Sequence, residues 1–202
     1  MKLYYSAGSP FVRKVLVTAI ECGFRDQLTL LPTNPHQSPP EFVALNPFSK
    51  VPTLVLHDGT VLFESLLICE YLDDLAGGGV VLPRSQAQRW QVLRKHALGN
   101  GLMEASVLRR VESLCAKDTD RERNLTRQIA ITQRALDSIG AGAQTLGTEL
   151  ELGNLSIAIA LGYLDFRFPT DCWREGRPQL ALWFEQYSIR SSLVATVPHD
   201  PR

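Results

Sequence analysis

Along the first 75 residues, short runs with strand character alternate with longer runs in which apolar residues recur at helical spacing. The short runs are rich in β-branched, aromatic and leucine residues, as strands are, and occupy residues 2–5, 28–31, 53–56 and 61–63. Helical spacing begins after Pro10, after Pro40 and after Ser65. This mixed order predicts a small β-sheet covered by helices.

Beyond residue 84 the pattern changes to helical periodicity alone. Four segments carry it, over residues 86–115, 121–139, 155–166 and 178–189, and no strand pattern competes with them. The intervening stretch Ala76–Arg84 contains three consecutive glycines and a proline, which is typical of a domain boundary. We therefore predict an α/β domain over residues 1–78 and an all-α domain over residues 84–202.

Composition and charge exclude several classes of protein. The 202 residues are 45% hydrophobic, and Lys plus Arg equals Asp plus Glu at 21 each, so no net field favours nucleic acid or an anionic membrane. No apolar run reaches the roughly 20 residues of a membrane span or resembles a signal peptide, so we expect a cytoplasmic protein. Neither the histidines nor the four separated cysteines have metal-ligand spacing, so we expect no metal and reduced thiols.

Ser9 lies where the first predicted strand gives way to a helix. Serine is a favoured N-cap and Pro10 suits the first helical position. Free backbone N–H groups and the helix dipole make such an end favourable for an anion. Without a partner base, a serine is no nucleophile at neutral pH, so donation of a hydrogen bond is the simpler chemistry. A purely structural helix cap is the alternative.

Two further segments carry candidate binding groups. Lys50, Val51 and Pro52 precede a strand, and Glu64 with Ser65 opens a helix. The helix end suits a carboxylate, and an acidic side chain could hold an ammonium group. Structural interpretations also exist: Ser65 as a cap, Glu64 as a first-turn acid, and Val51-Pro52 as the entry to a strand.

The order of these motifs resembles the N-terminal domain of glutathione transferases. Ser9-Pro10-Phe11, Asn46-Pro47 with Lys50-Val51-Pro52, and Glu64-Ser65 follow one another as in that family. The stretch 160–168, ALGYLDFRF, is similar to the core helix in bacterial serine-type cytosolic members. The resemblance implies a thioredoxin-like N-terminal domain followed by an all-α C-terminal domain.

The resemblance also implies a role for each motif. Glutathione would be bound by Ser9, Phe11, Lys50, Val51, Pro52, Glu64 and Ser65, with Pro52 in the cis form. Ser9 would stabilise the glutathione thiolate, and Ser6 and Tyr5 are the competing hydroxyls. Serine stands where thioredoxin-like relatives carry a reactive cysteine, and the absence of cysteine at positions 6 and 9 argues against disulfide reduction.

The activity implied is transfer of glutathione to a small hydrophobic electrophile held between the domains, with glutathione as co-substrate and no cofactor. Phe11, Leu102, Met103 and Leu108 would line the electrophile pocket. We also expect a homodimer, with Arg13, Phe48 and the helix region that contains Glu64 facing or near the partner. Two alternatives stay open: a non-catalytic interaction protein, such as the stringent starvation proteins, and a glutathione-dependent isomerase or lyase.

One position departs from the family pattern. Members commonly carry Ser or Thr, with Asp three residues later, as a capping box before the 155–166 helix, whereas this chain has Glu151 and Asn154. We therefore predict a weaker start to that helix without a change of architecture.

Overall fold

The computed structural model describes residues 1–200 and divides the chain into two compact units. The first comprises residues 1–86 together with the C-terminal segment from Ser191, and the second comprises Ala87–Arg190. Mixed α/β structure in the first unit and helices in the second confirm the predicted fold class. The C-terminal segment was predicted to belong to the helical domain, and its grouping with the first unit corrects that boundary.

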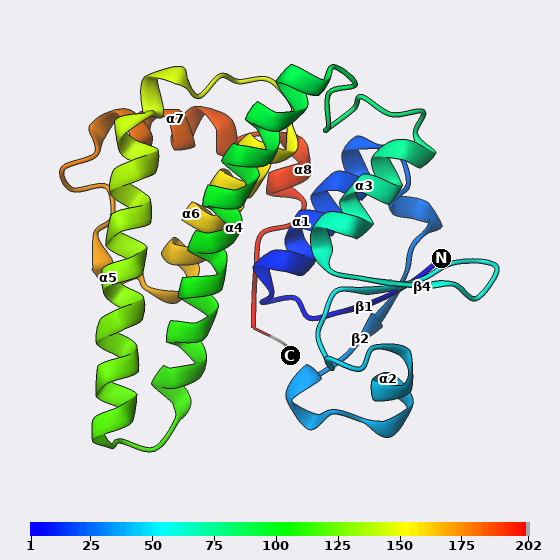
Figure 1. The fold of residues 1–202 in the computed structure, drawn as a ribbon, viewed down its shortest axis with the longest axis horizontal. Helices are drawn as coiled ribbons and strands as arrows, with labels where there is room; N and C mark the ends of the chain where they lie inside the picture. The colour runs from blue at the N-terminus through cyan, green and yellow to red at the C-terminus, as the bar shows by residue number, and fades with distance from the viewer. Residues whose placement is uncertain (201–202) are drawn as a thin grey trace. The chain divides into compact units, whose positions relative to one another are not determined.

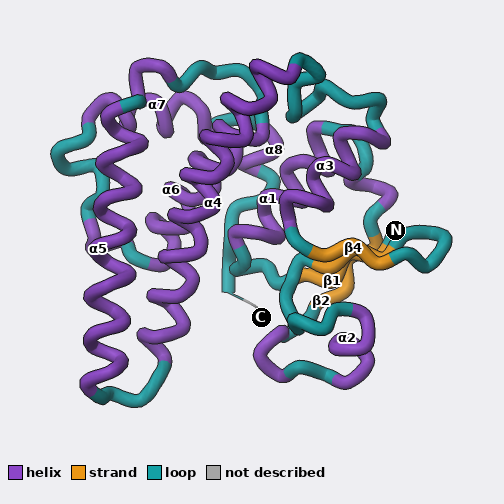
Figure 2. Tube along the Cα trace, viewed as in Figure 1, coloured by secondary structure: helices purple, strands orange, loops and turns teal. Residues whose placement is uncertain are grey.

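The first unit is built around a four-stranded sheet in the order β2-β1-β3-β4. β1 and β2 are parallel, whereas β1 with β3 and β3 with β4 are antiparallel. α1 and α3 cover one face of the sheet and α2 lies on the other (Figures 1 and 2). The elements are β1 (Lys2–Tyr5), α1 (Pro10–Glu21), β2 (Thr29–Pro32), α2 (Pro40–Leu45), β3 (Thr53–Val55), β4 (Val61–Phe63), α3 (Ser65–Leu75) and α8 (Ser191–Val194).

The second unit packs its helices around α6. The helices are α4 (Gln86–Leu114, whose first residue belongs to the first unit), α5 (Thr119–Ala141), α6 (Leu152–Arg167) and α7 (Pro178–Ser188). Nearly every residue of α6 from Leu152 to Leu164 is buried. At Gly99 of α4, the backbone of α6 lies so close that an added Cβ would stand 2.6 Å from the Ser156 carbonyl carbon. Apolar residues on all sides of α6 explain this central position.

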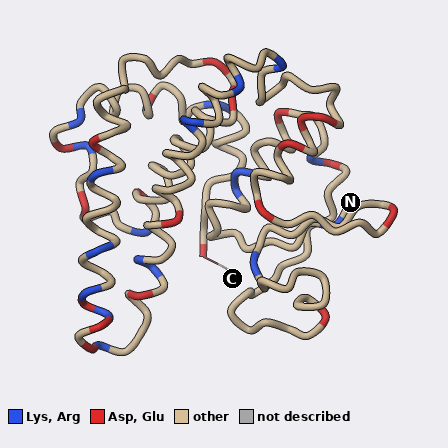
Figure 3. Tube along the Cα trace, viewed as in Figure 1, with Lys and Arg blue, Asp and Glu red and all other residues tan. Residues whose placement is uncertain are grey.

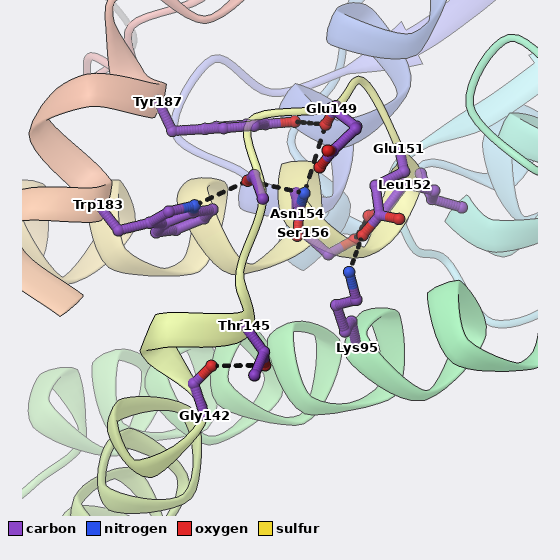
Figure 4. Close-up of polar contacts among 11 residues, drawn as sticks. Lys95, Gly142, Thr145, Glu149, Glu151, Leu152, Asn154, Ser156, Trp183 and Tyr187 are labelled. Carbon is purple, nitrogen blue, oxygen red and sulfur yellow. Dashed lines mark hydrogen bonds and ion pairs between the residues drawn. The ribbon is translucent and has the colours of Figure 1, made fainter. Parts of the chain in front are cut away.

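The start of α6 bears out the expected absence of a capping side chain. Glu151 occupies the N-cap position, but its side chain accepts no hydrogen bond from the helix. Its carboxylate instead pairs with the Lys95 ammonium at 2.5 Å. The buried Asn154 amide donates to the carbonyls of Gly147 and Glu149, which also accept from Trp183 and Tyr187 (Figure 4). The preceding loop is therefore held by other side chains.

The stretch after α3 is held in place by Asp73. One carboxylate oxygen accepts the N–H groups of Val80 and Val81 at 2.9 and 2.7 Å, and the other accepts that of Gly79 at 3.0 Å. Asp73 is buried at 4% exposure, so these bonds satisfy a carboxylate with little access to water. The glycine-rich boundary segment is thus an ordered connection.

Charges of both signs are interspersed along the described chain (Figure 3). Within residues 1–200, no helix combines the length and apolarity needed to cross a bilayer. In that same range, no three His, Cys, Asp or Glu side chains gather into a group that could hold a metal ion.

Candidate functional site

Strand register brings three of the predicted motifs to one edge of the sheet. Tyr4 of β1 lies opposite Thr53 of β3, and Thr53 lies opposite Phe63 of β4. The turn after β1, the residue before β3 and the residue after β4 therefore lie at the same ends of adjacent strands. Pro52 directly precedes β3, Glu64 directly follows β4, and Ser9 closes the turn that follows β1.

Ser9 caps α1 and remains half-buried. Its backbone is extended, with φ −84° and ψ 123°, and its Oγ accepts the Val12 N–H at 3.3 Å. The Ser9 N–H donates to the Ser6 carbonyl at 3.0 Å, which closes the turn after β1. Because the hydroxyl serves the helix as an acceptor, its proton can be donated to an anion. The cap and the predicted site role are thus compatible in one side chain.

Asn46 organises the loop before β3, a role that the sequence motif alone did not reveal. Its side chain is buried at 1% exposure and donates to the Lys50 carbonyl and to Thr53 Oγ1, both at 2.9 Å. Its Oδ1 accepts the Phe48 N–H at 3.0 Å, while Thr53 Oγ1 donates to the same Lys50 carbonyl at 2.9 Å. This network fixes the backbone on both sides of Lys50.

Val51 and Pro52 follow this network directly. The peptide bond between them is cis, as expected from the resemblance. Pro52 is buried, Val51 is half-buried, and Lys50 is exposed. Within residues 1–200, neither the N–H nor the carbonyl of Val51 has an intramolecular partner. A backbone segment with an unpaired N–H and carbonyl can pair with an extended peptide, as the edge strand of a sheet does.

Glu64 is the N-cap of α3, whereas Ser65 is the first residue of the helix. Glu64 has a φ of 75°, which lies in the left-handed region that non-glycine residues seldom adopt. Its Oε2 accepts the Leu66 N–H at 2.9 Å, and Ser65 Oγ donates to Oε1 at 3.1 Å. Since Ser65 is buried and Glu64 is exposed, the carboxylate stands at a helix N-terminus with access to solvent. Both predicted structural alternatives for this motif, Ser65 as the cap and Glu64 as a first-turn acid, are therefore wrong.

The four residues predicted to line the electrophile pocket differ in exposure. Leu102 and Met103 have no exposed surface and serve as core of the helical unit, so we no longer assign them to a pocket wall. Leu108 on the same helix is 51% exposed, and Phe11 on α1 is half-buried. Both therefore keep surface that a ligand could contact. Periodicity could not separate these cases, because a helix presents similar leucines to core and solvent.

Residues 8–75 match the family model of the glutathione S-transferase N-terminal domain. The uncharacterized GST-like protein YibF of Escherichia coli (strain K12) is 33% identical over 202 residues, covering 98% of each chain.

Two crystal structures of a glutathione transferase family member from Pseudomonas fluorescens Pf-5 are also similar. One holds glutathione, with 38% identity, a TM-score of 0.92 and 98% of each chain covered. The other holds S-(propanoic acid)-glutathione, with 37% identity, a TM-score of 0.88, and 98% of this chain and 100% of that chain covered. Family model, full-length relative and shared fold agree, and the chain belongs to the glutathione transferase superfamily.

Proposed function

We propose that the protein binds glutathione at the edge formed by β1, β3 and β4 and transfers it to a small hydrophobic electrophile. The observation that carries this proposal is the strand register, which brings Ser9, Val51-Pro52 and Glu64 to one edge of a single compact unit. The Pseudomonas fluorescens relative with bound glutathione, similar over 98% of each chain, supports the same ligand here.

Each part of glutathione has a matching group in this proposal. The extended backbone of the tripeptide pairs with the N–H and carbonyl of Val51, and its γ-glutamyl ammonium group meets the Glu64 carboxylate. The γ-glutamyl carboxylate meets the N-terminus of α3 around Ser65, where helix N–H groups favour negative charge. Lys50, which is exposed, is available to the other carboxylate of the ligand. Phe11 borders the sulfur.

Ser9 is the proposed thiolate-stabilising residue. The thiol proton leaves to solvent, and the Ser9 hydroxyl donates a hydrogen bond to the resulting thiolate at the N-terminus of α1. Lowering a thiol pKa from about 8.5 by about two units requires roughly 2.7 kcal/mol. A hydrogen bond to a charged group supplies about 1.5–3 kcal/mol, and the helix end about 0.3–1 kcal/mol. The two together are sufficient.

The chemical step is formation of a sulfur–carbon bond. The thiolate attacks an electrophilic carbon. In a substitution, the leaving group departs with its electron pair; in an addition to a double bond, the carbanion that forms takes up a proton. The relative that holds S-(propanoic acid)-glutathione contains a glutathione whose sulfur carries such a carbon substituent. That ligand favours conjugation over the non-catalytic alternative.

Titration of the bound thiol tests the proposal. Calorimetry measures glutathione binding to the wild type, and thiolate absorbance is then followed against pH in the saturated complex. We expect Ser9→Ala to raise the bound thiol pKa by about one to two units, from the loss of about 1.5–3 kcal/mol. Ser6→Ala and Tyr5→Phe are the matched controls. An unchanged titration in Ser9→Ala would remove Ser9 from this role, and no binding at millimolar glutathione would overturn the function.

The electrophile class and the assembly state are further parts of the proposal. A panel of an aryl halide, an unsaturated carbonyl and an epoxide, each assayed with glutathione, separates conjugation from isomerase or lyase activity.

The proposed homodimer is supported by Phe48, which lies in the loop that Asn46 organises. Its side chain is 66% exposed and packs edge-on against Phe63. Sedimentation at several concentrations measures the assembly state. The proposed location of this activity is the cytoplasm.

A further inference from the structure

The C-terminal segment of the chain is attached to the helix that begins at Ser9. Arg13 Nη2 donates to the Leu193 carbonyl at 3.0 Å, and Arg13 Nε donates to Thr196 Oγ1 at 3.4 Å. At the other end of α1, Ser192 Oγ donates to Glu21 Oε1 at 2.5 Å. α8 therefore lies along α1 within the first unit (Figure 1). The expected position of Arg13 near a partner subunit stays a prediction.

Arg13 shares a face of α1 with Ser9. The two residues are four positions apart, and the Arg13 N–H donates to the Ser9 carbonyl at 3.0 Å as the first helical bond. Side chains at this spacing are neighbours, and side chains in a helix lean toward its N-terminus. Arg13 therefore lies one turn after Ser9 on α1, and its guanidinium is held by Leu193 and Thr196.

The charge of Arg13 lacks an opposite charge within the described chain. Its partners are a carbonyl and a hydroxyl, and no carboxylate of residues 1–200 forms an ion pair with it. Burial lowers the pKa of the Arg13 guanidinium to about 10, so it stays cationic at neutral pH. A partly buried cation without a counter-charge is unfavourable by itself and becomes favourable when an anion binds beside it.

We propose that the C-terminal segment, through Leu193 and Thr196, positions the Arg13 guanidinium beside Ser9, where its charge stabilises the glutathione thiolate. This inference rests on the proposed function and deepens it. Arg13 adds a full charge to the hydrogen bond of Ser9 and to the dipole of α1. Thr196 is a positioning residue, since it acts through Arg13, and its hydroxyl is itself oriented by donation to the Ser192 carbonyl at 2.8 Å. The thiolate site would then be built from both ends of the chain.

The test is the pKa of glutathione's thiol in the saturated complex. Arg13→Met removes the charge at similar length, and we expect the bound thiol pKa to rise by about one unit, the lower end of the effect of an opposite charge within about 4–6 Å. Arg13→Lys keeps a charge but loses the planar fork, and should restore most of the wild-type value. Thr196→Val removes the hydroxyl without touching the charge, and we expect about half of the shift seen in Arg13→Met.

Ser192→Ala is the matched control, because it releases α8 from Glu21 and leaves both partners of Arg13 in place. Its thiol pKa should equal that of the wild type, whereas an equal rise in Ser192→Ala and Thr196→Val would show a general loosening of α8 and overturn the inference. If Arg13→Met fails to fold, the bound thiol pKa of Thr196→Val is compared with that of Ser192→Ala, and a higher value in Thr196→Val supports the inference. A wild type that binds no glutathione defeats the proposed function as well. If the wild type lowers the pKa of the bound thiol and all these variants lower it equally, this inference is wrong and the proposed function stands.

Discussion

Replacement of Asn46 by Asp tests whether the loop before β3 is preorganised for the ligand. The substitution keeps the shape of the side chain and the oxygen that accepts the Phe48 N–H. It replaces the amide NH2, which donates to the Lys50 carbonyl and to Thr53 Oγ1, with a second oxygen. Thr53 can rotate its hydroxyl to donate to this oxygen, but the Lys50 carbonyl then faces it without a proton between them.

The expected loss of stability follows from these contacts. On balance two hydrogen bonds at about 1 kcal/mol each are lost, because a Thr53 hydroxyl that turns to the introduced carboxylate no longer donates to the Lys50 carbonyl. The buried carboxylate also faces a carbonyl dipole at a position with 1% exposure, so we expect a total loss of about 2–4 kcal/mol. Burial and the carbonyl both raise the pKa of the introduced carboxyl above its unfolded value. The folded state then binds more protons than the unfolded state, so the variant loses stability as pH rises. Its deficit should be smaller near pH 4.5 than near pH 7.5.

Three measurements complete this test. Urea unfolding at both pH values gives the stability of wild type and variant, and calorimetry gives glutathione affinity, which we expect to fall about tenfold because Lys50 and Val51 lose their fixed position. The thiol pKa in the saturated complex should not change, since Ser9 is untouched. Asn34→Asp is the matched control, because only its side-chain oxygen is used, by the His36 N–H at 3.1 Å. Wild-type affinity and stability in Asn46→Asp would refute the reasoning.

Three further substitutions and one chemical modification have defined outcomes. Gly99→Ala should lower the melting temperature by about 2–12 °C, since overpacking against the α6 backbone costs about 1–3 kcal/mol. Gly101→Ala, where a Cβ meets nothing within 4 Å, should raise it by a few degrees through helix propensity. Asp73→Asn should cost about 1.5–3 kcal/mol in urea unfolding, and unchanged stability would contradict the role of Asp73 in holding the 79–81 segment. Alkylation by iodoacetamide at pH 8, followed by mass spectrometry, should spare Cys22 and Cys69, because burial raises the pKa of these thiols to about 12 and about 11.

Local sequence predicted the elements that depend on periodicity and capping. The strand, turn and helix around Ser9 were predicted because serine at the N-cap and proline at the first helical position both favour that conformation. The helices of the second unit were predicted from long apolar repeats, with ends within a few residues of those observed. Such features need only interactions between near neighbours along the chain.

Other features depend on contacts that no local pattern records. The cap at Glu64 requires a positive φ, which propensity disfavours for this residue. α8 spans only Ser191–Val194, too short for a periodic signal, and its attachment to Arg13 joins residues about 180 positions apart. The role of Asn46 appears only once the loop closes onto Lys50. An asparagine beside a proline is otherwise typical of an ordinary turn.

The chemistry of the site follows from where sulfur can ionise. The two cysteines of the α/β unit have raised pKa values because burial disfavours their thiolates, so neither supplies a nucleophile at neutral pH. The exposed Cys115 and Cys172 belong to the helical unit. At the sheet edge itself stands the Ser9 hydroxyl, which donates a hydrogen bond but is too weak an acid to attack unaided. In the proposed function the reactive sulfur arrives with the substrate, and the raised pKa values of Cys22 and Cys69 argue against disulfide reduction by the thiols of the α/β unit.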